Sequence, residues 1–247
     1  PFKLTEVNGR YIARGAIDDK AMASAYVSVL DQLRREGFQP KRDIVLALTG
    51  GEEASDDDTN GAKWLATHAK DKIDAEFGFN EGGRGEYRNG KAYAHLMQVS
   101  EKAYVEYEFV ATGPGGHSAR PTRDNTIYEL SEALARLRQY RFPVEVSPIA
   151  RGFFERSAAL QPEGLKADFL AVAGGTPSQE VTDRLSDRPT LIGLLRNTCV
   201  PTMLTGGHAP NALAQTARAT VNCRLLPGTD VKFIDQKLAE IAGDKVK

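Results

Sequence analysis

The sequence predicts an α/β protein with two domains, and three observations support this prediction. Residues 43–49 (DIVLALT) form a continuous apolar run before two glycines, which is typical of a strand buried on both faces of a parallel sheet. A stretch with helical periodicity precedes this run. From about Ser100 the period changes to the alternation of a half-exposed antiparallel strand. We therefore expect a first domain over residues 1–99 and a second over residues 100–247.

The first domain is expected to alternate helices and strands. Apolar residues with helical spacing between Met22 and Leu33, followed by Gly37, predict a helix that ends near that glycine. The strand at 43–49 follows. Further along the chain we expect a helix at 61–70, a short strand at 75–83 that runs into a glycine turn, and a strand at 91–98.

The second domain is expected to have the element order β-α-β-β-α. In its first strand, at 101–113, Val105, Tyr107, Phe109 and Ala111 alternate with polar residues. The other expected elements are a helix at 125–138 with Ile127, Leu130, Leu134 and Leu137 on one stripe, strands at 198–204 and 217–226, and a helix with Val231, Ile234, Leu238 and Ile241 in phase. One more strand would complete a ferredoxin-type split βαβ sandwich. Residues 143–195 read as a mostly helical insertion.

Composition excludes several functional classes. The chain has 247 residues, and 32 Lys plus Arg against 33 Asp plus Glu give a formal charge of -1. No global field therefore attracts nucleic acid or an anionic membrane, and we expect neither as a partner. No apolar run is long enough to span a bilayer. The start, PFKLTEVNGRYIARG, has neither an initiator Met nor a signal-peptide pattern, so we expect it to be an internal cut.

Carboxylates follow the expected strand ends in three separate segments. They are Asp18 with Asp19, Glu52 with Glu53, and Glu81. The carboxyl ends of strands in an open α/β sheet line the ligand crevice, so these groups should lie close together. Crowded carboxylates repel one another unless one has a raised pKa or a cation binds. Oxygen ligands alone suit Mg²⁺ or Ca²⁺, whereas zinc would also require nitrogen ligands. The alternative to a metal site is that Glu52 and Glu53 belong to a solvated acidic turn.

Several motifs in order resemble the co-catalytic zinc metallopeptidases that include aminoacylase, succinyl-diaminopimelate desuccinylase, glutamate carboxypeptidases and bacterial dipeptidases. The motifs are GRYIARGAIDDK, TGGEEA, NEGG, GPGGHSARP, and GGHAPNAL with NCRLLPG, and together they cover almost the whole chain. The resemblance implies two Zn²⁺ per subunit in the intact protein, with Co²⁺ or Mn²⁺ as substitutes. It implies that Asp18 bridges the two ions, that Glu53 and Glu81 each bind one, and that Glu52 is the general base. It also implies a cis peptide between Asp18 and Asp19.

The same resemblance implies that the second domain is an inserted dimerisation (lid) domain with a ferredoxin-like βαββαβ fold. His117 would cross the interface of a homodimer and help bind the oxyanion in the neighbouring active site. Asn211 and Arg224 would hold the carboxylate of a small peptide or N-acyl amino acid substrate, because the guanidinium fork suits a carboxylate. From the residues alone, His117 is a surface histidine without a function. We assign no role to His68, His95 or His208.

The chain departs from the family pattern in three ways. The segment DDKAMAS lacks the usual glycines, and GEEASDDDTNGA is longer and more acidic than usual, so Asp56, Asp57 and Asp58 would disfavour acidic substrate side chains. The family also has two histidine ligands, one upstream of PFKLTE and one downstream of residue 247. We therefore expect a fragment with three of five ligands that binds zinc poorly or not at all as it stands.

The two cysteines, Cys199 and Cys223, lie on the expected strands that flank TGGHAPNALAQ. If these strands pair as a hairpin, the two sulfur atoms become cross-strand neighbours. A disulfide would favour a periplasmic or secreted protein over a cytoplasmic one. Two buried thiols are the alternative, and Pro201 is expected to introduce an edge or a bulge.

The sequence therefore predicts a metal-dependent hydrolase that cleaves the amide bond of dipeptides, C-terminal residues or N-acyl amino acids, with Glu52 as general base. Two other functions stay open. One is a catalytically inactive relative that acts as a binding protein. The other is a hydrolase of a non-peptide amide, such as a carbamoyl or acylated polyamine substrate, in which Arg224 has no carboxylate to hold.

Overall fold

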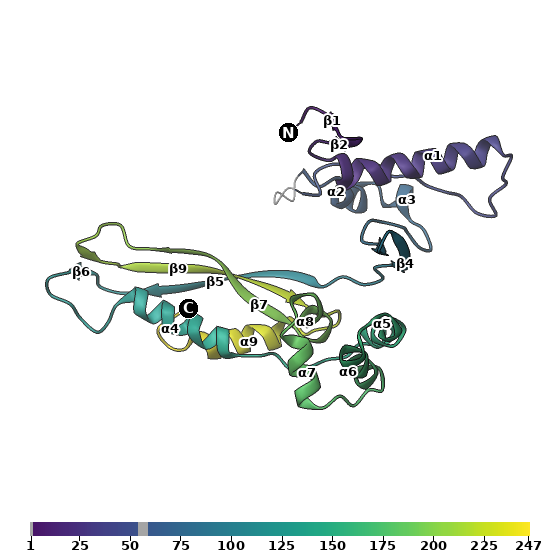
Figure 1. The fold of residues 1–247 in the computed structure, drawn as a ribbon. Helices are drawn as coiled ribbons and strands as arrows, with labels where there is room; N and C mark the ends of the chain where they lie inside the picture. The colour runs from purple at the N-terminus through teal and green to yellow at the C-terminus, as the bar shows by residue number, and fades with distance from the viewer. Residues whose placement is uncertain (1, 54–58) are drawn as a thin grey trace. The chain divides into compact units, whose positions relative to one another are not determined.

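The computed structural model describes residues 2–53 and 59–247, and the chain divides into two compact units, Pro1–Gln98 and Val99–Lys247 (Figure 1). The first unit carries the acidic motifs and the second carries His117, Asn211 and Arg224. None of the helices within the described ranges is long and apolar enough to cross a membrane. The catalytic and dimerisation roles of the two units stay predictions.

The first unit contains the helices that the sequence predicts. Strands β1 (Thr5–Val7) and β2 (Arg10–Ile12) form a hairpin that leads into the π-helical segment η1 (Ala16–Ala21) and helix α1 (Met22–Arg35). Gly37 has a φ of 73°, a left-handed conformation that favours glycine and ends the helix as predicted. The remaining elements are helices α2 (Gly61–His68) and α3 (Lys70–Ile73) and the antiparallel hairpin of β3 (Arg84–Arg88) and β4 (Lys91–Leu96).

Two predicted strands of the first unit are wrong. Residues 43–49 and 75–83 contain no strand, and Ile44 and Leu48 are 54% and 65% exposed. A strand needs a hydrogen-bonded neighbour, and neither segment has one among the described residues. The predicted parallel sheet is not confirmed either, because every strand pair among the described residues is antiparallel. The described part of this unit therefore has no fully buried residue.

The second unit has the predicted β-α-β-β-α order. Strands β5 (Ala103–Thr112), β9 (Thr216–Leu225) and β7 (Thr198–Gly206) form an antiparallel sheet in the order β5-β9-β7. Helices α4 (Thr126–Gln139) and α9 (Val231–Ala242) lie together on one face of this sheet (Figure 1). Val110 of β5 and Lys247 exchange backbone hydrogen bonds of 2.7 and 2.9 Å. Lys247 therefore pairs with the edge of β5 that faces away from β9.

The core of the second unit lies between the sheet and these two helices. Phe109 and Ala111 are buried and Val105 and Tyr107 pack against the same cluster, which confirms the predicted alternation. From the helices, the buried cluster includes Leu130, Ala133, Leu137, Ile234, Leu238 and Ile241. Each large side chain of this kind contributes about 1.5–3 kcal/mol when it is removed from water. Ile127 and Val231, which the predicted stripes also include, are exposed.

The predicted helical insertion is also confirmed. It consists of α5 (Pro148–Ser157), the short 3-10 turn η3 (Ala158–Leu160), α6 (Glu163–Ala173), α7 (Gln179–Ser186) and α8 (Pro189–Leu195). These helices pack around a cluster of their own that is centred on Phe154, Phe169 and Val172. The insertion therefore has its own hydrophobic core.

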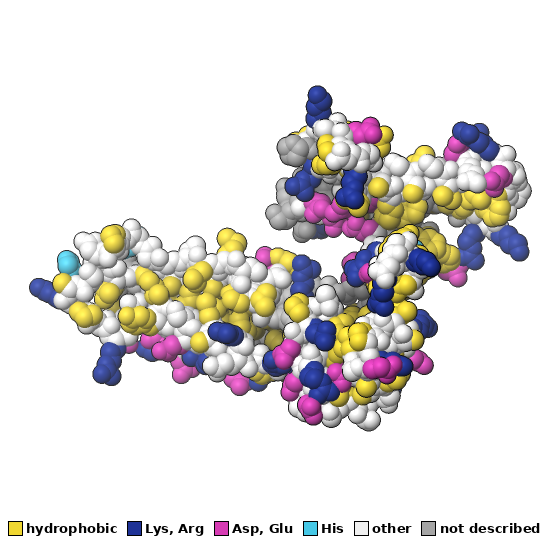
Figure 2. Space-filling model, viewed as in Figure 1, with side chains coloured by type: hydrophobic (Ala, Val, Ile, Leu, Met, Phe, Trp, Pro, Cys, Tyr) yellow, Lys and Arg dark blue, Asp and Glu magenta, His cyan; other side chains and the backbone are white. Residues whose placement is uncertain are grey.

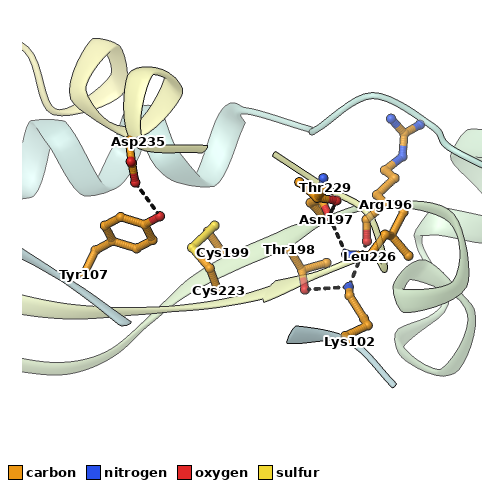
Figure 3. Close-up of a disulfide and its surroundings, with 10 residues drawn as sticks. All are labelled: Lys102, Tyr107, Arg196, Asn197, Thr198, Cys199, Cys223, Leu226, Thr229 and Asp235. Atoms are coloured by element: carbon orange, nitrogen blue, oxygen red, sulfur yellow. Dashed lines mark hydrogen bonds between the residues drawn. A yellow bond between two sulfur atoms is a disulfide. The ribbon is translucent and has the colours of Figure 1, made fainter. Parts of the chain in front are cut away.

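A disulfide joins Cys199 on β7 to Cys223 on β9 (Figure 3). The two cysteines are direct partners in the strand register, which is the arrangement that the sequence predicted for a hairpin. The register shifts between Pro201 and Met203, because proline cannot donate a hydrogen bond to the ladder. The bond closes a loop with a sequence separation of 24.

Denatured but unreduced protein is therefore expected to contain no titratable thiol, and reduced protein is expected to contain two. The Cys199→Ser, Cys223→Ser double variant should lose roughly 3 kcal/mol of unfolding free energy, because a loop of this length no longer restricts the unfolded chain. Thiol titration and urea unfolding measure the two effects. Two free thiols in the unreduced protein would contradict the disulfide.

Candidate active site

Asp18 and Asp19 lie in η1, immediately before α1. The peptide between them is cis, which confirms what the family resemblance implied. Asp18 is exposed, whereas Asp19 is half-buried and its buried Oδ1 has no hydrogen-bond partner in residues 2–53 and 59–247. A buried carboxylate oxygen without a partner is costly unless a donor or a cation satisfies it.

Glu52 and Glu53 lie in a turn that backbone contacts hold against the start of α2. Gly51 has a φ of 77°, and a Cβ atom at this position would lie 2.0 Å from the carbonyl oxygen of Thr59. The N–H of Gly61 donates to the carbonyl oxygen of Gly50 at 2.8 Å. Only glycine fits position 51, so this close approach fixes where the two glutamates leave the backbone. Asp56, Asp57 and Asp58, which are predicted to disfavour acidic substrate side chains, lie outside the described residues.

Glu81 is within electrostatic reach of both other acidic segments. Its pKa is raised, first by desolvation and then by the charges of Asp18, Glu52, Asp19 and Glu53. Glu81 is itself exposed, so the rise in its pKa reflects the proximity of these charges and makes no sizeable contribution to stability. Figure 2 shows acidic side chains gathered on this unit. The charges of the other four carboxylates thus act on Glu81, and the roles of these residues in one site stay predictions.

The acidic cluster of Asp18, Asp19, Glu52, Glu53 and Glu81 fits a cation in charge and in donor chemistry. Its oxygen atoms are hard ligands, desolvation and then the charges of the other four carboxylates raise the pKa of Glu81, and Asp19 Oδ1 has no hydrogen-bond partner among the described residues. These side chains do not adopt the geometry of a metal site. In residues 2–53 and 59–247 no group of three or more His, Cys, Asp or Glu side chains is arranged to hold a metal. No nitrogen ligand joins from His68, whose ring stacks on Trp64 on the surface of α2.

His117 and Asn211 lie together in the second unit. Strand β6 (Gly116–His117) pairs with β8 (Ala212–Leu213), and His117 is the direct partner of Ala212. The N–H of Ser118 donates to the carbonyl oxygen of Asn211 at 3.0 Å. The N–H of Ala119 donates to Nδ1 of His117 at 3.1 Å, so the neutral ring carries its proton on Nε2. The exposed imidazole therefore presents Nε2 as a donor.

Arg224 lies far from His117 and Asn211 within one chain. Thr216, at the other end of β9, is the partner of Thr112 near the β6–β8 pair, whereas Arg224 is the partner of Tyr104 and Thr198 at the opposite end. Arg224 follows Thr216 by eight residue steps along β9, which correspond to roughly 26 Å of strand. Figure 1 shows β6 and the start of β7 at opposite ends of the sheet. One chain cannot place Asn211 and Arg224 on the same carboxylate.

The sequence prediction missed a basic residue beside Arg224. Lys102 is half-buried, and burial, followed by the charge of Arg224, lowers its pKa. The signal was the alternation of the strand that follows, because Lys102 falls two residues before Tyr104 and so on the same face. A separate hollow of about 560 Å³ near Asp168 and Arg184 in the helical insertion contains none of the predicted site residues.

Comparison with known proteins is consistent with these features. The sequence profile of peptidase family M20/M25/M40 matches residues 1–239. Carboxypeptidase S of Saccharomyces cerevisiae is 30% identical over 240 residues, which cover 93% of this chain and 41% of that protein. The N-fatty-acyl-amino acid synthase/hydrolase PM20D1 of Mus musculus is 26% identical over 254 residues, which cover 100% of this chain and 50% of that protein. The chain thus spans about half the length of these relatives.

Solved structures show weaker likeness. An M20 family metallo-carboxypeptidase, Sso-CP2 from Sulfolobus solfataricus, has 17% identity and a TM-score of 0.36 over 57% of this chain and 40% of its own. The di-peptidase Dug1p from Saccharomyces cerevisiae has 13% identity and a TM-score of 0.31 over 58% of this chain and 34% of its own.

Proposed function

Because this chain belongs to peptidase family M20/M25/M40, we propose that it carries out metal-dependent hydrolysis of the amide bond in dipeptides, C-terminal residues or N-acyl amino acids. The observation that carries this proposal is the acidic cluster, in which three distant segments of sequence come within electrostatic reach of one another. Carboxypeptidase S and an N-fatty-acyl-amino acid hydrolase among the relatives support the substrate class.

We propose Asp18, Glu53 and Glu81 as metal ligands, for two Zn²⁺ per subunit or for Co²⁺ or Mn²⁺ in their place. Asp18 would bridge the ions, and Glu53 and Glu81 would each bind one of them. When bound, such ions polarise the scissile carbonyl and lower the pKa of water. The negative charge of the acidic cluster supports this assignment, since desolvation and then the neighbouring carboxylates raise the pKa of Glu81 and a bound cation would oppose that rise.

Glu52 is proposed as the general base. Consecutive residues in a turn direct their side chains differently, so Glu53 can bind metal while Glu52 stays free to move protons. Glu52 would accept a proton from the attacking water and deliver it to the amide nitrogen that leaves. The closed turn at Gly51 supports this division of roles, because it fixes the backbone from which both glutamates project.

We propose that the substrate's carboxylate is held by groups from two subunits. Arg224 of one subunit would bind it, with Asn211 and His117 supplied by the other, because these groups are too far apart within one chain. His117 would donate from Nε2 to the oxyanion. The active site of a homodimer would then be completed across the subunit interface.

The free edge of β7 supports the proposed homodimer. β7 is an edge strand, and its Met203 and Leu204 are 64% and 67% exposed. A long edge strand with apolar side chains is prone to pair with another strand. The exposed Ile127 of α4 lies near Gly206 at the end of this strand, which extends the apolar surface onto the helix.

The two alternative functions are less well supported. An inactive binding protein would have no need to keep Asp18, Glu52, Glu53 and Glu81 together, and the structure describes all four. A hydrolase of a non-peptide amide would leave Arg224 without a carboxylate. The disulfide supports an oxidising compartment, periplasmic or secreted, because such bonds persist there.

A matched pair of substrates tests the proposed function. The zinc-loaded full-length protein is expected to hydrolyse an N-acetyl amino acid and to act at least about tenfold less efficiently on its carboxamide, because Arg224 loses a charged partner. Release of the free amine measures both rates, and chelation should abolish them. Equal rates on both compounds would favour the non-peptide amide alternative, and no turnover of either by the zinc-loaded protein would support the inactive relative.

A further inference from the structure

Lys102 is held at the base of the sheet in the second unit, beside the end of α8. Its Nζ donates to the carbonyl oxygen of Arg196 at 2.9 Å and to Oγ1 of Thr198 at 3.4 Å (Figure 3). The side chain is half-buried. These two bonds fix the ammonium group next to the first residues of β5 and β7, and the third donor position of the amine stays available.

Arg224 converges on the same place. Its direct partners across the sheet are Tyr104 and Thr198, and residues that face each other on neighbouring strands project on the same side. The guanidinium lies 4.7 Å from the centre of the Tyr104 ring. Lys102 bonds to Thr198 and precedes Tyr104 by two residues, so both cations occupy this face. The alternate residues Val105 and Cys223 pack in the cluster with α4 and α9, so the two cations lie on the face that these helices leave uncovered.

No counter-ion accompanies this pair. Within the described residues neither Lys102 nor Arg224 takes part in an ion pair. Glu106 shares the face, but its carboxylate interacts with the Tyr104 hydroxyl and raises the pKa of that tyrosine. Burial, followed by the charge of Arg224, lowers the pKa of Lys102 to about 8. Two cations without an anion are unfavourable together, and a bound anion would remove the repulsion.

We propose that Lys102 and Arg224 together bind the free carboxylate of the substrate, with Lys102 as a second substrate-binding cation. The assignment of the anion as the substrate's carboxylate rests on the proposed function. Arg224 offers a planar fork for the two carboxylate oxygens, and Lys102 adds a compact charge from a fixed position. Two cations discriminate more strongly than one cation against substrates in which an amide replaces the carboxylate.

The Lys102→Met variant tests this proposal because methionine keeps the length of the side chain and removes its charge. For an N-acetyl amino acid we expect KM to rise about 10- to 100-fold with kcat changed less than about twofold, because a charge-assisted hydrogen bond to the bound carboxylate is lost. For the carboxamide analogue KM should not change. Lys102→Arg should retain most of the affinity, and Lys166→Met, which removes a lysine from the Glu163 ion pair on α6, should behave as wild type.

A purely structural role for Lys102 predicts a different pattern. Loss of its bonds to Arg196 and Thr198 would lower activity on the acid and the carboxamide alike. Equal losses on both substrates, or a fall in kcat with KM unchanged, would overturn the proposal. A thermal unfolding midpoint that matches the Lys166→Met control would show that the variant is folded.

Direct binding separates this proposal from the proposed function. Calorimetric titration with N-acetylglycine requires no turnover, and we expect Lys102→Met and Arg224→Met each to weaken binding at least about tenfold. Wild-type affinity should also fall as the pH rises above 8, because Lys102 loses its charge, whereas Lys102→Arg should keep its affinity. Binding that depends on Lys102 in a protein without hydrolytic activity would overturn the proposed function alone. Binding unaffected by either variant, or absent in the wild type, would overturn this inference.

Discussion

Replacement of Glu52 by glutamine in the full-length protein is expected to lower kcat by a factor of about 10² to 10⁴ while the zinc content stays the same. Glutamine keeps the size and hydrogen-bonding capacity of glutamate but cannot accept a proton from water. The acidic cluster loses one negative charge and retains Asp18, Glu53 and Glu81, the three proposed ligands. Steady-state kinetics and metal analysis of the same preparation measure both quantities.

Glu36→Gln is the matched control, because Glu36 is an exposed glutamate that follows α1 and accepts a hydrogen bond from Gln32. This variant should match the wild type in kcat and in zinc content. Unchanged turnover in Glu52→Gln would reject Glu52 as the base. Simultaneous loss of zinc would instead place Glu52 among the ligands.

Mixed dimers of two inactive variants are expected to recover about one quarter of the wild-type activity if each active site combines residues of two subunits. His117→Ala should lower kcat about 10²- to 10³-fold, because an oxyanion donor is lost. In a mixed dimer with Glu52→Gln, one site contains both an intact Glu52 and an intact His117. The other site contains neither, and half of the dimers in a random mixture are mixed.

Co-expression of the two variants with different affinity tags gives the mixed dimers for assay. Each variant expressed alone serves as the control and should remain inactive. If His117 acted within its own chain, neither site of the mixed dimer would be intact and the mixture would stay inactive. A monomer in sedimentation equilibrium would contradict the shared site at once.

Local sequence patterns predicted the helices and strands whose formation depends on residues that are near in sequence. The helical periodicity of α1 and α4 and the alternation of β5 were sufficient, because the period of apolar residues reports which face is buried. The apolar run at 43–49 shows the limit of this approach. It indicates burial, but pairing depends on a neighbouring strand that the run itself does not specify.

The candidate site was predictable to the same extent. The motifs placed the five carboxylates together, and the raised pKa of Glu81 agrees with that grouping. They did not reveal that His117, in the β6–β8 pair, and Arg224, at the far end of β9, lie far apart, because this separation follows from strand register and not from sequence distance. Lys102 was missed for the same reason, since only the pairing of β5, β7 and β9 brings it to Arg224.

The central claim is that Asp18, Glu53 and Glu81 bind metal ions while Glu52 stays free. Anomalous diffraction at the zinc edge from crystals of the zinc-loaded protein tests this most directly. Our account predicts anomalous peaks within about 2.0–2.2 Å of carboxylate oxygens of these three residues, and none at that distance from Glu52. Zinc bound at a different site, or these three carboxylates facing separate surfaces in the loaded protein, would contradict the account.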